Sequence, residues 1–166
     1  QSQYLDVDAL ANLDGGAGGL RRFEHRPKLR DPLIGGGKEL LRAFILGSEV
    51  MIRVGESYLG KSQYKGFHTT GTCGVFGAAA GCGLFLGNDA TQTTYALGIS
   101  GSFSAGVMKW RREGSWQKPL QAGHAAMCGI LAASLGGKNF LGARSIFEEP
   151  DGVVRLFSLD DDYDFA

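Results

Sequence analysis

A chain of 166 residues is long enough for about one domain, and its 17 basic residues balance its 17 acidic residues. This balance provides no basic stripe for a polyanionic partner, so the composition argues against nucleic-acid binding. The cysteines form no CxxC pair and are typical of buried free thiols in a reducing compartment, the cytoplasm or the mitochondrial matrix: Cys73, Cys82 and Cys128.

Glycine is the unusual component of the composition. The chain holds 27 glycines, above the usual share of roughly 7%, and most of them lie inside apolar segments rather than in Ser/Pro-rich linkers. Each glycine inside a helix costs about 1 kcal/mol relative to alanine. We therefore expect the glycines to permit a close approach, either between helix backbones or between the backbone and a ligand.

Residues 1–34 are predicted to be irregular, with at most one short helix at about residues 7–13. A glycine cluster at residues 15–19 lacks the GxGxxG spacing of a dinucleotide-binding turn. Residues 35–38 also fail as a phosphate loop, because Glu39 replaces the hydroxyl residue and Pro32 replaces the first glycine. The first residues lack the charged-then-apolar pattern of a signal peptide. Because it begins at Gln1 instead of Met, we expect it to be a piece of a longer protein.

The first two long segments have the pattern of helices. Over residues 38–58, apolar and small residues recur at three- and four-residue steps and predict an amphipathic helix with one apolar stripe: Leu40, Leu41, Phe44, Ile45, Ser48, Met51, Ile52 and Gly55. A second helix is expected to begin near residues 69–72, where a hydroxyl can accept a first-turn N–H, and to end at Gly87.

Two further helices are expected downstream. Asn88 or Asp89 caps a helix that continues to about residue 110, with a stripe over residues 96–108 and two arginines at the negative end of its dipole. Residues 113–115 make a turn. Pro119 fits the first position of the next helix, which ends at Gly136.

The C-terminal part is predicted to hold only short elements. Residues 145–149 resemble a short helix, residues 153–157 a strand, and residues 160–164 a solvated acidic tail. The sequence therefore predicts a mainly α fold, a Gly/Ala-rich domain of closely packed helices over residues 35–158.

His68 carries the first functional signal, because it stands just before a predicted helix. First-turn N–H groups there carry about half a positive charge and bind a carboxylate or phosphate. The hydroxyls of Thr69 and Thr70 and the small Gly71 would let an anion approach the backbone, so these three residues are predicted to bind substrate. The imidazole can act as a general acid or base near neutral pH. The alternative is a loop histidine that caps or packs locally.

Lys118 repeats this placement at the start of the last long helix. A cation there opposes the helix dipole, so its position needs another reason. Binding a substrate carboxylate, or stabilising charge that develops on one, would supply that reason. The alternative is an ordinary surface lysine.

Other candidate sites are weaker. His124 and Cys128 lie four residues apart on one helix face, but no further Cys or His is near, so we expect a core pair and no metal. Cys73 lies in a first helical turn, which can lower a thiol pKa, although a small buried thiol is the expected state. Glycines at residues 77–87 repeat a membrane-helix spacing. The apolar run over residues 73–86 is shorter than the roughly 18 residues of a span, so no membrane is expected.

Five stretches carry a resemblance to a known family: GFHTTGTCG at residues 66–74, FGAAA at 76–80, ALGISGS at 96–102, KPLQAGHAA at 118–126 and IFEEPDG at 146–152. With the helix at residues 40–54, they resemble in the same order the MmgE/PrpD superfamily. That group includes 2-methylcitrate dehydratases, cis-aconitate decarboxylases and iminodisuccinate epimerases. The resemblance covers about residues 36–158.

The resemblance implies a mostly helical domain with an α+β lid, a homodimer, and cofactor-free chemistry on small polycarboxylates. His68 matches a histidine that lines the family's site, and Lys118 matches its site lysine. The lid is expected to be absent, so residues 159–166 are either the acidic tail or the start of a lid. The family's Asp-rich motif and following histidine are not reproduced by the residues that precede position 36: Asp6, Asp8, Asp14 and His25.

The leading hypothesis is a cofactor-independent lyase or isomerase acting on a dicarboxylate or tricarboxylate. Lys118 and the helix N-termini would stabilise developing negative charge while His68 transfers a proton. Dehydration, decarboxylation and epimerisation share this type of intermediate. The alternatives are a non-catalytic relative that serves as a binding or assembly module, and an aconitase-like iron–sulfur lyase that uses the three cysteines.

Overall fold

The computed structural model describes residues 36–58, 61–148 and 150–158. The expectations for residues 1–34, including the short helix at 7–13, and for the acidic residues 160–164 lie outside the described residues. Within the described residues the fold is mainly α, as predicted, and the extended structure consists of one isolated antiparallel bridge between Phe67 and Val107.

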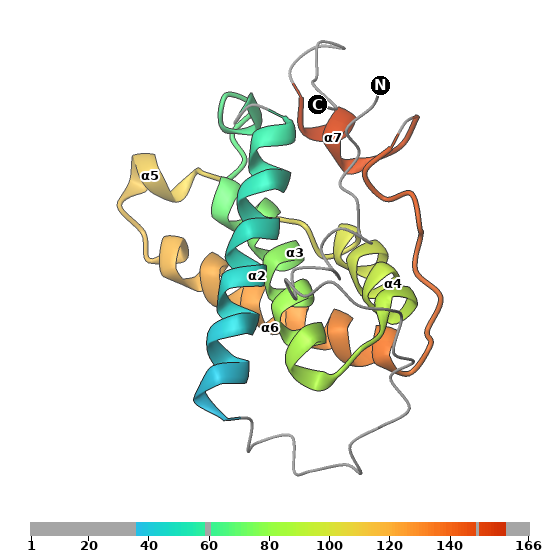
Figure 1. The fold of residues 1–166 in the computed structure, drawn as a ribbon. Coiled ribbons are helices and arrows are strands. Elements are labelled where there is room, and N and C mark those ends of the chain that lie inside the picture. The colour runs from blue at the N-terminus through green and yellow to red at the C-terminus, as the bar shows by residue number, and fades with distance from the viewer. Residues whose placement is uncertain (1–35, 59–60, 149, 159–166) are drawn as a thin grey trace.

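Four long helices build the described part of the domain: α2 (Gly37–Ser57), α3 (Thr69–Leu86), α4 (Ala90–Gly101) and α6 (Gln117–Gly137). The shorter elements are the 3-10 turn η1 (Lys61–Gln63), α5 (Trp110–Glu113) and α7 (Val153–Phe157). In Figure 1, α2 lies in front of α3, α6 crosses behind it, and α4 lies to one side. Because α3 contacts all three of the other long helices, it is the centre of the fold.

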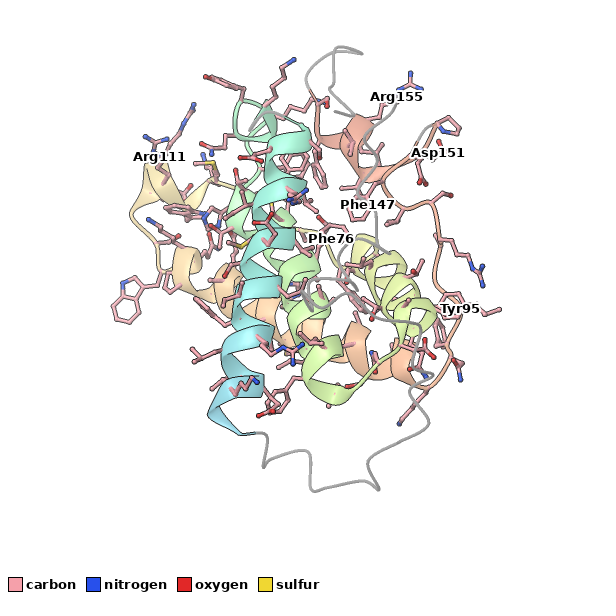
Figure 2. The ribbon with its side chains drawn as sticks, viewed as in Figure 1. Phe76, Tyr95, Arg111, Phe147, Asp151 and Arg155 are labelled. Atoms are coloured by element: carbon pink, nitrogen blue, oxygen red, sulfur yellow. The ribbon has the colours of Figure 1, made fainter. Side chains whose placement is uncertain are left out.

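The composition of α3 follows from this central position. Its buried residues occupy every face, without the one-sided stripe of a surface helix. Phe76 is fully buried and packs against Phe147, with the ring centroids 5.1 Å apart (Figure 2). The helix is long and apolar enough to cross a membrane, a property it shares with core helices of soluble proteins, and 56% of its length is buried inside the structure.

Glycine lets α3 approach its neighbours closely, as the composition predicted. A Cβ atom added to Gly47 in α2 would lie 2.7 Å from the carbonyl oxygen of Gly77 in α3. On the α6 side, a Cβ on Gly129 would lie 2.8 Å from the backbone nitrogen of Ala79. Neither position has room for a side chain. The close backbone contact supplies dispersion energy that offsets the cost of glycine in these helices.

The apolar stripe of α2 lies largely on the exposed face of the helix. A stripe of this kind ordinarily faces the core, but α2 turns its smaller residues Ala43, Gly47, Val50 and Val54 towards the interior. The reason is the glycine contact with α3, which large side chains would prevent. The α2 apolar face consists of side chains that are 36–70% exposed: Leu40, Leu41, Phe44, Ile45, Met51 and Ile52.

Local signals set most of the helix ends correctly. Gly87 ends α3 in the left-handed conformation, with φ of 79°. Asp89 caps α4 in a capping box with Gln92. α3 begins at Thr69, within the predicted range, but the expected hydroxyl cap is wrong, because His68 is the N-cap residue and no side chain caps the helix. α6 begins at Gln117, so Pro119 lies within the first turn rather than at its first position.

The helix predicted to continue to residue 110 ends at Gly101 instead. Residues 102–109 form a loop whose backbone bonds to the start of α3. The amide of His68 donates to the carbonyl of Gly106 at 3.0 Å, and the amide of Met108 donates to the carbonyl of Gly66 at 2.7 Å. Serine and glycine are frequent in residues 100–106 and favour a helix weakly, so these tertiary bonds outweigh helical continuation.

Two short C-terminal predictions were wrong. Residues 144–147 form turns rather than a helix, because the chain folds back and the amide of Val153 donates to the carbonyl of Ile146 at 2.8 Å. Residues 153–157 form α7 rather than a strand. No strand pairs with them in the described part of the chain. The helical turn instead packs Phe157 against Phe67 and Tyr58, at centroid distances of 5.1 and 5.7 Å.

Candidate active site

The loop of residues 102–109 fixes the candidate site, because it is fastened to the first turns of α3. In addition to the backbone bond to His68, the hydroxyl of Ser104 donates to the carbonyl of Thr72 at 2.8 Å. Gly106, whose carbonyl accepts from His68, has φ of 131°, which favours glycine. The loop thereby delivers Trp110, the first residue of α5, to the histidine.

His68 is enclosed by side chains from two other elements. Its side chain is buried, and its Nδ1 lies 2.8 Å from Oε1 of Gln121 in α6. Its ring meets the Trp110 ring edge to face at a centroid distance of 5.3 Å. Trp110 Nε1–H donates to the same Oε1 at 3.2 Å. The histidine is therefore packed, as the alternative of a locally packing loop histidine predicted. Its neighbours, however, come from distant parts of the sequence.

Lys118 reaches the same tryptophan from the first turn of α6. The residue is exposed, and its Nζ lies 5.8 Å from the centroid of the Trp110 ring, a cation–π distance. Both predicted catalytic residues thus contact one indole ring. We call His68, Trp110, Lys118 and Gln121 the His68 cluster.

The three predicted substrate-binding residues follow directly after His68. Thr70 is exposed, whereas the hydroxyl oxygen of Thr69 is buried and has no hydrogen-bond partner among the described residues. Gly71 is buried and packs so closely against the carbonyl of Ala105 that a Cβ would not fit. Its small size therefore serves the contact between α3 and the loop, and its part in substrate binding stays a prediction.

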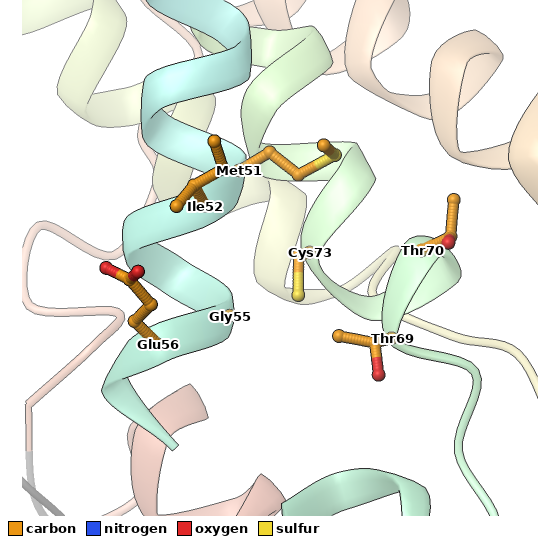
Figure 3. A pocket seen from close by; sticks show the side chains of 7 residues that line it. All are labelled: Met51, Ile52, Gly55, Glu56, Thr69, Thr70 and Cys73. Carbon is orange, nitrogen blue, oxygen red and sulfur yellow. The ribbon is translucent and has the colours of Figure 1, made fainter. Parts of the chain in front are cut away.

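A groove between α2 and α3 is lined by none of the four residues of the His68 cluster, although Thr69 and Thr70 line it (Figure 3). Its volume is about 430 Å³, and neither His68 nor Lys118 lines it; its lining consists of Met51, Ile52, Gly55, Glu56, Thr69, Thr70 and Cys73. Most of this lining is apolar, and the one carboxylate, on Glu56, would repel a polycarboxylate. The groove therefore lacks the charges that the predicted substrate needs.

The comparison with known families decides the identity of this fold. A family model described as the MmgE/PrpD N-terminal domain matches residues 17–166. The chain belongs to the MmgE/PrpD family. The match extends beyond residues 36–158, which carry the motifs, at both ends.

Two relatives of this MmgE/PrpD chain are similar over 74% of its length. The cis-aconitate decarboxylase of Homo sapiens is 33% identical over 123 residues. The cis-aconitate decarboxylase-like protein oryM of Aspergillus oryzae is 30% identical over 124 residues. These stretches cover 25% and 26% of the two relatives, so the chain spans about a quarter of the length of the curated relatives that it matches.

The cysteines of this MmgE/PrpD chain are free thiols. Cys73 and Cys128 are buried, and Cys128 Sγ lies 3.4 Å from Nε2 of His124. Because His124 is exposed, the expectation of a core pair was wrong for the histidine. Cys73 Sγ contacts the hydroxyl of Tyr58, and burial raises the pKa of both groups. Cys73 is therefore a buried protonated thiol, as expected. The described residues contain no group of three or more His, Cys, Asp or Glu side chains that could hold a metal ion.

Sequence reasoning missed Trp110 and Gln121 as members of the site. Trp110 fell at the end of a helix that the structure interrupts, so its approach to His68 had no local signal. Gln121 did have a local signal in the sequence, because it lies three residues after Lys118 and therefore shares a face of α6 with it.

Proposed function

We propose that this MmgE/PrpD chain supplies His68 and Lys118 to a cofactor-independent lyase or isomerase that acts on a small polycarboxylate. The proposed type is a 2-methylcitrate dehydratase or a cis-aconitate decarboxylase. The observation that carries the proposal is that His68 and Lys118, far apart in the sequence, contact the same Trp110 ring. An isolated loop histidine and an isolated surface lysine would have no reason to converge.

The charge in the proposed site suits a carboxylate. Lys118 presents an ammonium group to solvent beside the indole, where it can pair with one carboxylate of the substrate. The amides of Thr69 and Thr70 lie in the first turn of α3, where backbone N–H groups have no partner within the helix, so they can bind an anion. These groups would stabilise negative charge that develops in the transition state.

His68 is proposed to move the proton. When a base removes a proton from carbon beside a carboxylate, the electron pair of the C–H bond spreads into that carboxylate. In dehydration, the pair then expels hydroxide from the neighbouring carbon, and a proton converts it to water. In decarboxylation, the pair comes from the bond to the departing CO2, and a proton is delivered to carbon. Each route needs a group that exchanges protons near neutral pH.

A panel of substrates tests the proposal. The intact protein is incubated with 2-methylcitrate, cis-aconitate and iminodisuccinate, and product formation is followed by NMR. We expect turnover of 2-methylcitrate or cis-aconitate. Turnover of iminodisuccinate alone would assign an epimerase instead. Failure to convert any of the three would contradict the proposed function.

The α2 apolar face supports a second candidate, a binding or assembly module. Its six large side chains are 36–70% exposed, and an exposed apolar surface of this kind marks an interface. We propose that a second copy covers it, forming a homodimer. Light scattering should show a dimer for the parent protein and a monomer for Phe44→Glu, while Trp116→Glu, an exposed control, stays dimeric. A parent protein that is monomeric would overturn the homodimer. A dimer without turnover would favour the module over the enzyme.

A further inference from the structure

The side-chain amide of Gln121 is held at both ends by groups that allow only one orientation. The indole Nε1–H of Trp110 can only donate, and it lies 3.2 Å from Oε1. The carbonyl oxygen of Val107 can only accept, and Nε2 of Gln121 lies 2.9 Å from it. Both neighbours require the same assignment of oxygen and nitrogen, so the hydrogen-bond network fixes the direction of the amide.

This orientation determines the hydrogen bond to His68. The atom facing His68 Nδ1 at 2.8 Å is Oε1 of Gln121, an acceptor. Nδ1 must therefore carry the proton. In a neutral imidazole, a proton on Nδ1 leaves the lone pair on Nε2.

We infer that Gln121 is a positioning residue that holds His68 in the Nδ1–H tautomer and so makes Nε2 the nitrogen that exchanges protons. That last step rests on the proposed function. A proton taken from a substrate C–H bond would be added at Nε2 and give an imidazolium, with the electron pair left on the substrate. Nδ1–H keeps its bond to Gln121 in both the neutral and the charged ring. The histidine can accept a proton and return it without rearrangement of its neighbours.

The surroundings of Gln121 keep the amide in place. A Cβ added to Gly106 would lie 3.2 Å from the end of the Gln121 side chain, so the loop backbone closely covers it. Gln121 and Lys118 are three residues apart on α6, which places them on one face of the helix. The first turns of α6 thereby supply both the charge and the control of the tautomer.

Nitrogen NMR of the purified protein tests the tautomer without any need for activity. The chain has three histidines, and labelling them with 15N allows the protonated and unprotonated ring nitrogens to be distinguished. Loss of one set of signals in His68→Gln assigns His68. At about pH 8.5, where imidazoles are neutral, we expect His68 to show a protonated Nδ1 and an unprotonated Nε2. A parent spectrum with the proton mainly on Nε2 would overturn the inference.

Three variants separate positioning from general packing. Gln121→Met keeps the length but removes the acceptor, so His68 should become a mixture of tautomers. Gln121→Glu keeps an acceptor oxygen and should retain the Nδ1–H form. Gln117→Met, an exposed glutamine at the start of the same helix, should leave the spectrum unchanged. If Gln121→Met also retains the Nδ1–H form, Gln121 does not set the tautomer. If Gln121→Met does not fold, the parent and Gln121→Glu spectra still decide.

Kinetics connect the tautomer to turnover. Gln121→Met should lower kcat by up to about 10²-fold, with little change in KM, because the base but not the anion site is affected. Gln121→Glu should recover part of that loss. A parent protein that turns over no substrate but shows the Gln121-dependent Nδ1–H form would refute the proposed function and leave the tautomer inference standing. An active protein with the proton on Nε2 of His68 would support the proposed function and refute the tautomer inference.

Discussion

The His68 cluster and the α2–α3 groove meet the same end of α3 but differ in how they are built. The cluster joins α3, α5 and α6, and its polar atoms are matched to specific partners at 2.8–3.2 Å. The groove lies between α2 and α3, and most of its lining is apolar. The cluster offers a cation and a proton carrier, whereas the groove offers volume. In this protein, the α2–α3 groove and the convergent polar groups are different places.

The difference has a physical origin in the side chains of the two sites. At the groove, Gly55 and Cys73 leave space because both are small. At the cluster, the long-range bonds of the 102–109 loop bring large side chains together. If function depends on the cluster and not on the groove, substitutions in the cluster should change the kinetics far more than substitutions in the groove.

Loss of His68 should have the largest effect. His68→Gln should lower kcat by roughly 10²- to 10⁴-fold, the usual contribution of general acid–base catalysis, with a smaller change in KM. Because the ring is buried against Trp110, a lower melting temperature is also expected. His124→Gln, on the exposed side of α6, is the control. Unchanged kcat for His68→Gln would make the residue structural.

Loss of Lys118 should have the second-largest effect on kcat. Removal of a pre-organised charge-stabilising group typically lowers kcat by roughly 10²- to 10³-fold, and substrate binding should weaken as well. The melting temperature should stay constant, because the side chain is exposed. Steady-state kinetics and a thermal melt of Lys118→Ala measure both quantities. Lys138→Ala, at the other end of α6 and also exposed, should retain parent kinetics.

Trp110 should show a graded effect. Trp110→Phe keeps a ring for Lys118 and His68 but loses the N–H bond to Gln121, and should cost about threefold in kcat/KM. Trp110→Leu loses the ring as well and should cost about tenfold. If both variants keep the kcat/KM of the parent protein, the indole does not organise the cluster.

The thiol on the groove side should be visible in stability at alkaline pH. Burial raises the pKa of Cys73 in the folded state, while an unfolded thiol ionises near about pH 8.5. Below that pH both states are protonated and the contribution is constant. Above it only the unfolded state loses its proton, so the free energy of unfolding falls by up to about 1.4 kcal/mol per pH unit. Urea titrations from about pH 7.5 to 10 should show a shallower decline for Cys73→Ala. Identical slopes would contradict the assignment.

Filling the groove should have the smallest effect. A Cβ at Gly55 would lie 3.3 Å from Cys73 Sγ, so Gly55→Ala needs only a slight adjustment. Its gain in helix propensity is about 1 kcal/mol at most, and kcat and KM should equal those of the parent. A large rise in KM would identify the groove, and not the His68 cluster, as the substrate site.

Much of the fold was predictable because its signals are local. Gly87 ends α3 and Asp89 with Gln92 starts α4 through bonds that span a few residues. The motifs at residues 66–74 and 118–126 identified the family and marked His68 and Lys118. The close helix contacts also followed from composition, because glycine at helical spacing leaves a backbone open to its neighbour.

The tertiary structure decided what depends on distant partners. The break after Gly101, the helical form of residues 153–157 and the outward turn of the α2 apolar face each oppose a local pattern. The same holds for the contact of Trp110 and Gln121 with His68, which brings three elements together. A sequence pattern reports preferences within one or two turns. The bonds and packing contacts that outweigh those preferences form only when remote segments meet. The full set of site residues could therefore be identified only from the tertiary structure.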